Sequence, residues 1–304
     1  MPTLEKFKQY FKILEDIKAE KRDFWDPMEH LGPFGETLLH IACLYNQNDI
    51  AEFLVATRVQ RDHAEKLLDA RYQEQPYRGE TALHIAIAQG NVSLVKLLLK
   101  NKADINGRCV GSFFRGSTGI YTGELPQSFA AAIPTSNNSN KDIFDLLMAH
   151  VAEDPNSRPR HDDKEGDDRL KAGISQLNHK ARAQYDQLAE VDEEAYDHPE
   201  YKGNTTFHVL VITGNIDMYE HIVSKYSQVS LLVEKKKNAR GLTPLALAAK
   251  LGLPEFFQYL VMRTKISHWN YGLFLPFYSL SPCLQTLCCS CRPNGRGDFS
   301  RRGS

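Results

Sequence analysis

A short motif returns several times along the sequence, and this repetition restricts the fold more than any other feature. The motif reads GETLLHIA at 35–42, GETALHIA at 79–86, GNTTFHVL at 203–210 and GLTPLALA at 241–248, with a weaker copy, GELPQSFA, at 123–130. Apolar residues at helical spacing follow the five copies, at 50–55, 92–99, 143–147, 218–223 and 255–260. A recurring motif of this kind predicts a stack of similar units, each burying its apolar face on its neighbours.

The motif is the ankyrin signature, in which a glycine precedes T-P-L-H-x-A. The glycine permits a tight turn at positive φ, and the threonine caps the first helix of each unit. His40, His84 and His208 are expected to bond backbone in the turn of a neighbouring repeat. No second ligand lies at metal spacing from them. The sequence therefore predicts an all-α ankyrin solenoid with five recognisable repeats and a concave binding face.

The repeats are spaced irregularly, which predicts long loops, or fingers, between them. Their starts lie 44, 44, 80 and 38 residues apart, whereas regular ankyrin repeats recur at about 33 residues. The extra residues fall near 56–78 and 107–122. The second of these fingers carries Phe113, Phe114 and Tyr121 among glycines. These aromatics form either a packed hairpin or a protein-contact surface.

The longest insertion, 153–202, is charged. Its part at 155–168 is polar and is expected to be disordered. A helical stripe follows at Leu170, Ile174, Leu177, Ala181 and Leu188, which predicts a helix that either packs back on the solenoid or docks a partner. The segment is net acidic, unlike the basic amphipathic helices that calmodulin binds.

Both ends of the chain lie outside the clear repeats. Residues 1–34 are predicted to form a helix that is either a degenerate repeat or a cap on the end of the stack. Residues 35–264 are predicted to form the ankyrin domain. Residues 265–281 resemble a linker, and the tail at 282–304 is expected to be disordered. Its Cys288, Cys289 and Cys291 lie beside arginines, which suits a lipidated membrane tether, a metal site or an end without a selected role.

Composition excludes several classes of function. The net charge is -1, which gives no basic excess for nucleic acid. The N-terminus has no apolar signal core, and six cysteines in 304 residues do not make a disulfide scaffold, so a cytoplasmic protein is expected. The only long uncharged run is broken by Pro276 and Pro282, which argues against a spanning helix. No G-x-S-x-G, P-loop or H-E-x-x-H motif is found, so we expect no enzyme.

Three stretches together resemble the cytosolic N-terminal domain of the vanilloid-type transient receptor potential (TRPV) cation channels. They are YRGETALHIAI at 77–87, YTGELPQSFAA at 121–131 and WNYG at 269–272. The GELP variant is unusual among ankyrin repeats, and W-x-Y-G resembles the opening of the family's linker. The resemblance covers roughly residues 35–281, apart from the acidic insertion.

The resemblance implies a part of a calcium-permeable channel that acts in subunit assembly and regulation. Four copies would surround the channel axis, as a homo- or hetero-tetramer with TRPV-type subunits, on the cytoplasmic face of the plasma membrane. The protein-contact residues it implies here are Phe113, Phe114, Tyr121, Tyr77, Arg78, Trp269 and Tyr271. Calmodulin is a further partner of some members. The alternative is a free-standing ankyrin scaffold that binds another protein through its concave face and fingers.

The nucleotide-binding pattern of some family members is not kept. Two lysines that contact phosphate in those members align with Glu36 and His40 here, and a neutral amide aligns with Glu80. Only the aromatic Tyr77 remains. Because carboxylates repel a triphosphate, we expect no ATP binding and no other cofactor.

Overall fold

The computed structural model describes most of the repeat region and parts of the flanking segments. The described residues are 3–20, 31–59, 67–114, 121–135, 139–153, 174–191, 202–264, 266–271 and 275–279. The chain divides into two compact units, Met1–Pro244 and Leu245–Ser304. The predicted disordered stretch at 155–168 and the cysteine tail lie outside the described residues.

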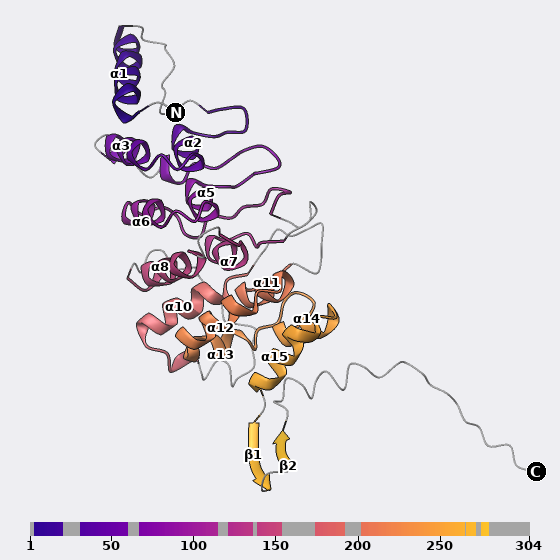
Figure 1. Ribbon diagram of the computed structural model, residues 1–304. Coiled ribbons are helices and arrows are strands. Elements are labelled where there is room, and N and C mark those ends of the chain that lie inside the picture. Colours follow the sequence, from indigo (N-terminus) through magenta and orange to yellow (C-terminus); the bar gives the residue numbers. More distant parts are fainter. Residues whose placement is uncertain are drawn as a thin grey trace, which may run out of the picture. The chain divides into compact units, whose positions relative to one another are not determined.

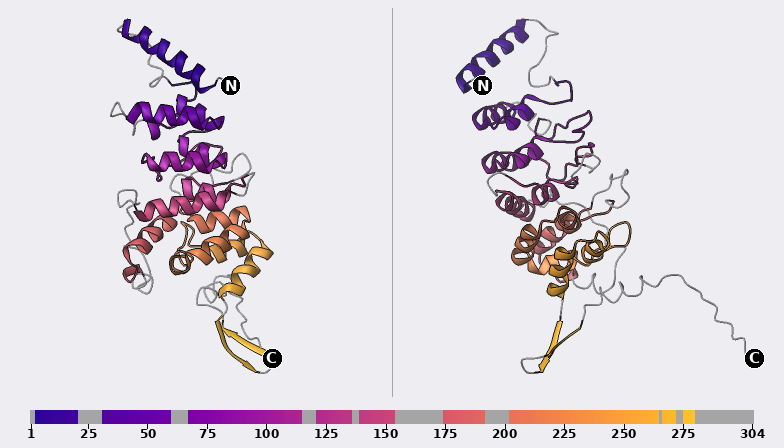
Figure 2. Two further views of the ribbon diagram at one scale, coloured as in Figure 1. Left: turned by 60° about the vertical axis from the view of Figure 1, so that its left-hand side comes forward. Right: turned by 45° about the vertical axis from the view of Figure 1, so that its right-hand side comes forward.

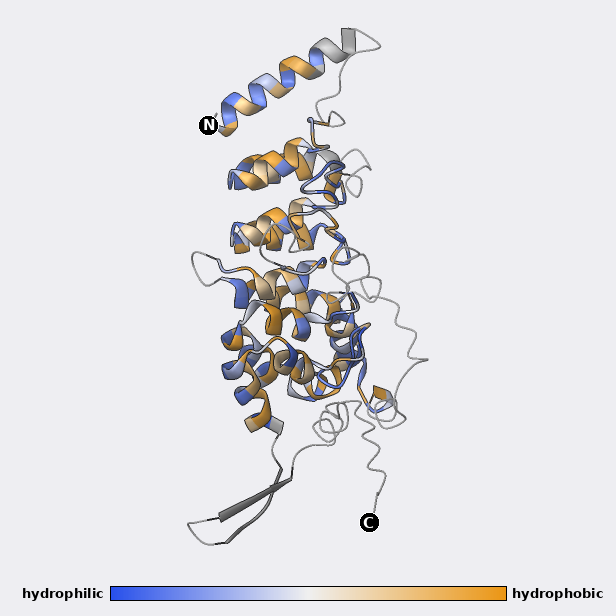
Figure 3. Cartoon of the chain, turned by 90° about the vertical axis from the view of Figure 1, so that its right-hand side faces the viewer, coloured by the Kyte–Doolittle hydropathy of each residue, from blue (hydrophilic) through white to orange (hydrophobic). Residues whose placement is uncertain are grey.

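Helix pairs stack one on another through the first unit, as Figures 1 and 2 show. The pairs are α2 (Leu38–Leu44) with α3 (Asn48–Val59), α5 (Ala82–Ala88) with α6 (Val92–Lys100), α7 (Pro126–Ala132) with α8 (Asn140–Glu153), and α11 (Thr206–Thr213) with α12 (Ile216–Lys225). Hydrophobic residues gather along these stacked helices (Figure 3). The predicted all-α ankyrin solenoid is confirmed.

A fifth pair, α14 (Pro244–Lys250) with α15 (Pro254–Thr264), belongs to the second unit, and α14 begins at the boundary. Two antiparallel strands follow, β1 (Ile266–Tyr271) and β2 (Leu275–Ser279), with Trp269 opposite Phe277. Both strands lie within residues 265–281, the segment that resembles a linker in the sequence. The strands form where β-branched and aromatic residues, which favour extended backbone, replace the helical pattern.

Three further helices supplement the pairs: α1 (Leu4–Glu20), α10 (His179–Ala189) and α13 (Ser227–Val233). The rings of Phe7 and Phe11 on α1 pack against Phe53 of α3, with centroids 6.1 and 5.5 Å away. In the long insertion, α10 begins at His179, where Asn178 caps it by accepting a hydrogen bond from the Ala181 N–H at 2.8 Å. Leu170, the first residue of the predicted stripe, lies outside the described residues.

Helix α10 is an interior element of the stack. It packs against α8 and α13 (Figure 1), and its Ala183, Tyr185 and Leu188 are fully buried. Of the two alternatives left open for the insertion, this part of it packs back on the solenoid.

A Thr–His pair starts three of the inner helices. The threonine hydroxyl lies 2.9 Å from the histidine Nδ1 in Thr37–His40, Thr81–His84 and Thr205–His208. The backbone N–H groups of Thr37 and Thr205 also donate to the partner Nδ1, at 3.1 and 3.2 Å. Since Nδ1 accepts these bonds, the ring proton resides on Nε2 and the histidine is neutral.

The Nε2 of His208 donates to the backbone carbonyl of Leu242 at 2.9 Å, in the turn that leads to the next repeat. For this histidine the expected backbone bond is confirmed. Burial lowers the pKa of His40 and His208 to about 4 and that of His84 to about 3. Hydrogen bonds to nearby backbone carbonyls raise these pKa values, but by less than burial lowers them.

We expect the fold to lose stability between pH 6.5 and 5. The three histidines have folded-state pKa values below the unfolded value of 6.5, so the unfolded state binds protons first. Their contribution is complete above pH 6.5 and declines as the pH falls toward about 4, each by up to about 1.4 kcal/mol per pH unit. Glu80 acts in the opposite direction. Burial raises its pKa to about 8, so in this range the folded state holds a proton that the unfolded state has released, and this contribution to stability increases as the pH falls.

Urea unfolding at several pH values would measure this slope. A His208→Gln variant should show a smaller slope, because one titrating group is gone. A free energy of unfolding that stays constant across this range would contradict the expectation.

Candidate protein-interaction surface

A row of aromatic rings runs from two fingers into the core. The ring centroids of Tyr77 and Phe113 are 5.5 Å apart, those of Phe113 and Phe114 are 5.1 Å apart, and those of Phe114 and Phe129 are 5.4 Å apart. At the outer end Tyr77 is 37% exposed and Phe113 is 42% exposed, while Phe114 at the inner end is 0% exposed. The row therefore links a surface patch rigidly to the interior.

Backbone hydrogen bonds hold the two fingers together. The N–H groups of Val110 and Gly111 both donate to the carbonyl of Arg78, at 2.9 and 2.8 Å, and Phe113 N–H donates to Pro76 at 3.1 Å. The backbones approach so closely that a Cβ atom at Gly111 would collide with the Pro76 carbonyl. Glycine is required here for the close approach itself.

The structure brings together only some of the predicted contact residues. Tyr77, Arg78 and Phe113 lie on the joined fingers. Phe114, at 0% exposure, supports this surface from beneath through its ring contact with Phe113. Tyr121, at 3% exposure, belongs to a separate buried cluster with Ala132 and Val209.

The remaining predicted positions lie elsewhere. Trp269 and Tyr271 belong to β1 in the second unit. The proposed lipidation sites Cys288, Cys289 and Cys291 lie outside the described residues.

A cavity of about 610 Å³ opens at the base of these fingers, and arginines line it. Arg71 pairs with Asp104 at 3.2 Å, and Arg108 pairs with Glu190 and, at 3.5 Å, with Glu124. Carboxylates thus neutralise two of the three guanidinium groups, and Asp69 also lines the space. This arrangement does not favour a bound anion.

Glu36 and His40, the two residues that align with the phosphate-binding lysines of some family members, differ in their hydrogen bonds and burial. Glu36 accepts a hydrogen bond from the Phe34 N–H at 2.8 Å. His40 is 0% exposed and lies inside the helix start, so it presents no charge to a ligand. Neither side chain supplies a cation for a phosphate group.

An exposed apolar stripe along α2 and its C-cap was not predicted from the sequence. Ile41, Leu44 and Tyr45 are 41%, 45% and 54% exposed, while Leu39 and Cys43 on the same helix are buried. The spacing i, i+3, i+4 marks one helix face. That spacing was visible in the sequence, but the stripe could not be told from a core-facing one.

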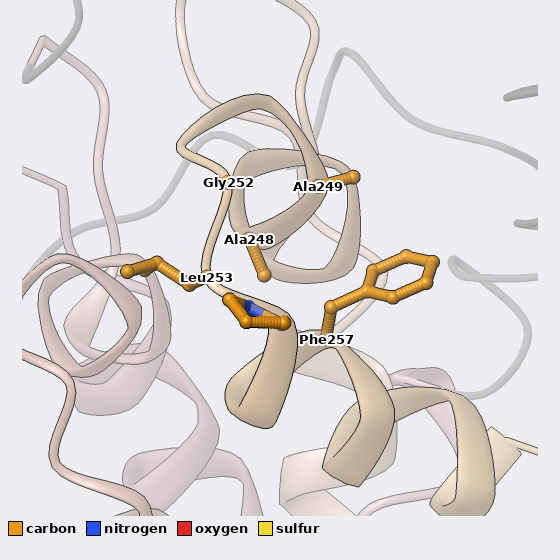
Figure 4. Close-up of a pocket in the computed structure, with 6 residues that line it drawn as sticks. Ala248, Ala249, Gly252, Leu253 and Phe257 are labelled. Atoms are coloured by element: carbon orange, nitrogen blue, oxygen red, sulfur yellow. The ribbon is translucent and has the colours of Figure 1, made fainter.

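A second, apolar cavity of about 340 Å³ lies in the last helix pair (Figure 4). Its lining comprises Ala248, Ala249, Gly252, Leu253, Pro254 and Phe257. The lining carries no titratable side chain, so the cavity suits apolar contact and not chemistry.

Within the described residues, no group of His, Cys, Asp and Glu side chains is arranged to hold a metal ion. None of the helices in this described part of the chain combines the length and the hydrophobicity of a membrane span.

Comparison with known proteins agrees with the ankyrin fold seen in the structure. A family model described as ankyrin repeats (3 copies) matches residues 8–109. The transient receptor potential cation channel subfamily V member 1 of Canis lupus familiaris is 29% identical over 266 residues, covering 79% of this chain and 26% of the relative. Member 6 of Homo sapiens is 30% identical, covering 85% and 27%, and member 5 of Rattus norvegicus is 33% identical, covering 79% and 27%.

The chain is an ankyrin-repeat protein related to the TRPV channels. It spans about a quarter of the length of these relatives. The matches are those that the ankyrin repeat region of a TRPV channel would give, and ankyrin repeats are a binding fold and not an enzymatic one.

We expect Gly111→Ala to loosen the paired fingers. The added methyl group would force the Pro76 backbone away, at a cost of about 1–3 kcal/mol in the free energy of unfolding. The matched control is Gly107→Ala in the same finger, where the nearest neighbour of the new Cβ would be Thr81 at 3.4 Å. Urea unfolding of the two variants measures the difference, and equal stabilities would contradict the expectation.

Proposed function

We propose that this chain acts as the ankyrin repeat region of a TRPV-type, calcium-permeable channel subunit, in subunit assembly and regulation on the cytoplasmic side of the membrane. The observation that carries the proposal is the relationship to TRPV channels across about four-fifths of the chain. The exposed aromatic fingers support it, because they offer a rigid surface of the kind that protein contacts use.

The contact surface in this proposal consists of Tyr77, Arg78 and Phe113. Phe114 holds it in place from the interior. Trp269 and Tyr271 of the β1 strand would form a second contact with a neighbouring subunit.

Replacing the exposed rings should weaken binding to other subunits. We expect the double variant Tyr77→Ala/Phe113→Ala to bind a full-length TRPV-type subunit at least about tenfold more weakly, since buried aromatic anchors dominate such interfaces. Co-purification and titration of the purified chain measure this. Tyr10→Ala, which removes a ring that is 64% exposed outside the fingers, is the control. Undiminished binding by the double variant would contradict the finger surface.

A free-standing ankyrin scaffold is the second candidate, and the exposed stripe of Ile41, Leu44 and Tyr45 on α2 favours it. In that case Leu44→Ser/Tyr45→Ser would abolish capture of the partner, and the finger variant would retain it. Calmodulin, the further partner implied by the family, is tested by the same variants with and without calcium.

We expect ATP not to bind. The positions that would meet its phosphates carry Glu36 and the buried, neutral His40. About 1 mM ATP should therefore leave the melting temperature unchanged, because a ligand stabilises only the state it binds. A melting temperature that rises with ATP concentration would overturn the expectation.

A further inference from the structure

One side chain of the second finger reaches the long insertion. The guanidinium of Arg108 donates to the carbonyl of Val191 at 2.7 Å and pairs with the carboxylate of Glu190, and both of these residues follow the end of α10. A third partner is the carboxylate of Glu124 in the GELP motif, 3.5 Å away. The finger and the insertion, which are 83 residues apart in the sequence, therefore meet at a single cation.

This contact is largely shielded from water. The side chain of Arg108 is 19% exposed, that of Glu190 is 11% exposed and that of Glu124 is 1% exposed. Charges in such a setting are screened little, and removing one member of a buried group costs more than breaking a surface pair. The guanidinium also suits the end of α10, because the helix dipole favours a cation there. The contact is therefore strong enough to hold the finger and the end of α10 together.

The backbone that follows Arg108 leads directly to the exposed finger surface. The N–H of Cys109 donates to the carbonyl of Glu124 at 2.8 Å, so the backbone is fixed at the same point as the side chain. Residues 110–111 then form the hydrogen bonds that join the two fingers. Next comes Phe113, whose ring is 42% exposed on the contact surface. A shift of the guanidinium is thus transmitted to this surface through a few residues of hydrogen-bonded backbone.

We propose that Arg108, with Glu190 and Val191, forms a latch through which the long insertion regulates the finger surface. While the end of α10 holds the guanidinium, the fingers stay joined and present Tyr77 and Phe113. Helix ends open before helix interiors, so release begins at the residues that hold the guanidinium, and the finger then loosens. The regulation of binding rests on the proposed function, whereas the latch itself does not.

Hydrogen exchange of the full chain tests the latch at the N–H groups of Val110, Gly111 and Phe113, which join the fingers. Glu190→Gln weakens the latch from the side of the insertion and changes no residue of the finger. We expect at least about threefold faster exchange at these N–H groups, because a buried charge pair is lost and local opening becomes easier. Arg108→Lys keeps the charge but loses the planar fork of N–H donors, and should act in the same direction.

Arg182→Gln is the matched control. Arg182 also lies on α10, but its guanidinium pairs with Asp186 at 2.8 Å and lies 5.5 Å from the centroid of the Tyr185 ring, within the same helix. This substitution perturbs α10 and leaves the latch residues in place, so exchange at the three finger N–H groups should match that of the unaltered chain. Circular dichroism checks that each variant is folded.

Two results would overturn the proposal. One is unchanged exchange at the finger N–H groups in both latch variants. The other is an equal increase in Arg182→Gln, which would trace the effect to a general loosening of α10. Both are measured on this chain alone, so neither depends on whether the fingers bind another subunit. Faster exchange in Glu190→Gln with undiminished subunit binding would support the latch and contradict the finger surface of the proposed function.

Discussion

The stack depends on the buried pairing of a threonine with a histidine at the start of an inner helix. In Thr205–His208 the ring accepts the backbone N–H of the capping threonine on one side and donates to the Leu242 carbonyl on the other. A single neutral ring thereby caps the start of one helix and joins it to the turn before the next repeat. Since both ring nitrogens are used, the group can remain buried without charge.

Positions without this histidine show how the same task is met otherwise. In the third inner helix Ser128 occupies the place of the histidine, and its hydroxyl accepts the Leu125 N–H at 3.3 Å. The shorter side chain caps its own helix. The unusual GELP motif is therefore a working variant of the cap, with Pro126 supplying the favoured first residue of the helix.

The long insertion contributes to the interior as well as to the loops. Arg108 of the second finger donates to the Val191 carbonyl at 2.7 Å and pairs with Glu190, both just beyond the C-terminal end of α10. A cation at this end of a helix is favoured by the helix dipole. Finger and insertion are thus joined directly through Arg108.

The sequence by itself determined the repeats, the second helices and the caps, because each is set by residues within a few positions of one another. It also indicated the aromatic finger. Only the tertiary structure decided that Phe113 faces outward while Phe114 and Tyr121 face inward, because burial depends on residues from other repeats. The convergence of Arg182 with Lys236 on the ring of Tyr185 was equally beyond sequence reasoning. It is produced by a contact between distant segments, which no short-range pattern records.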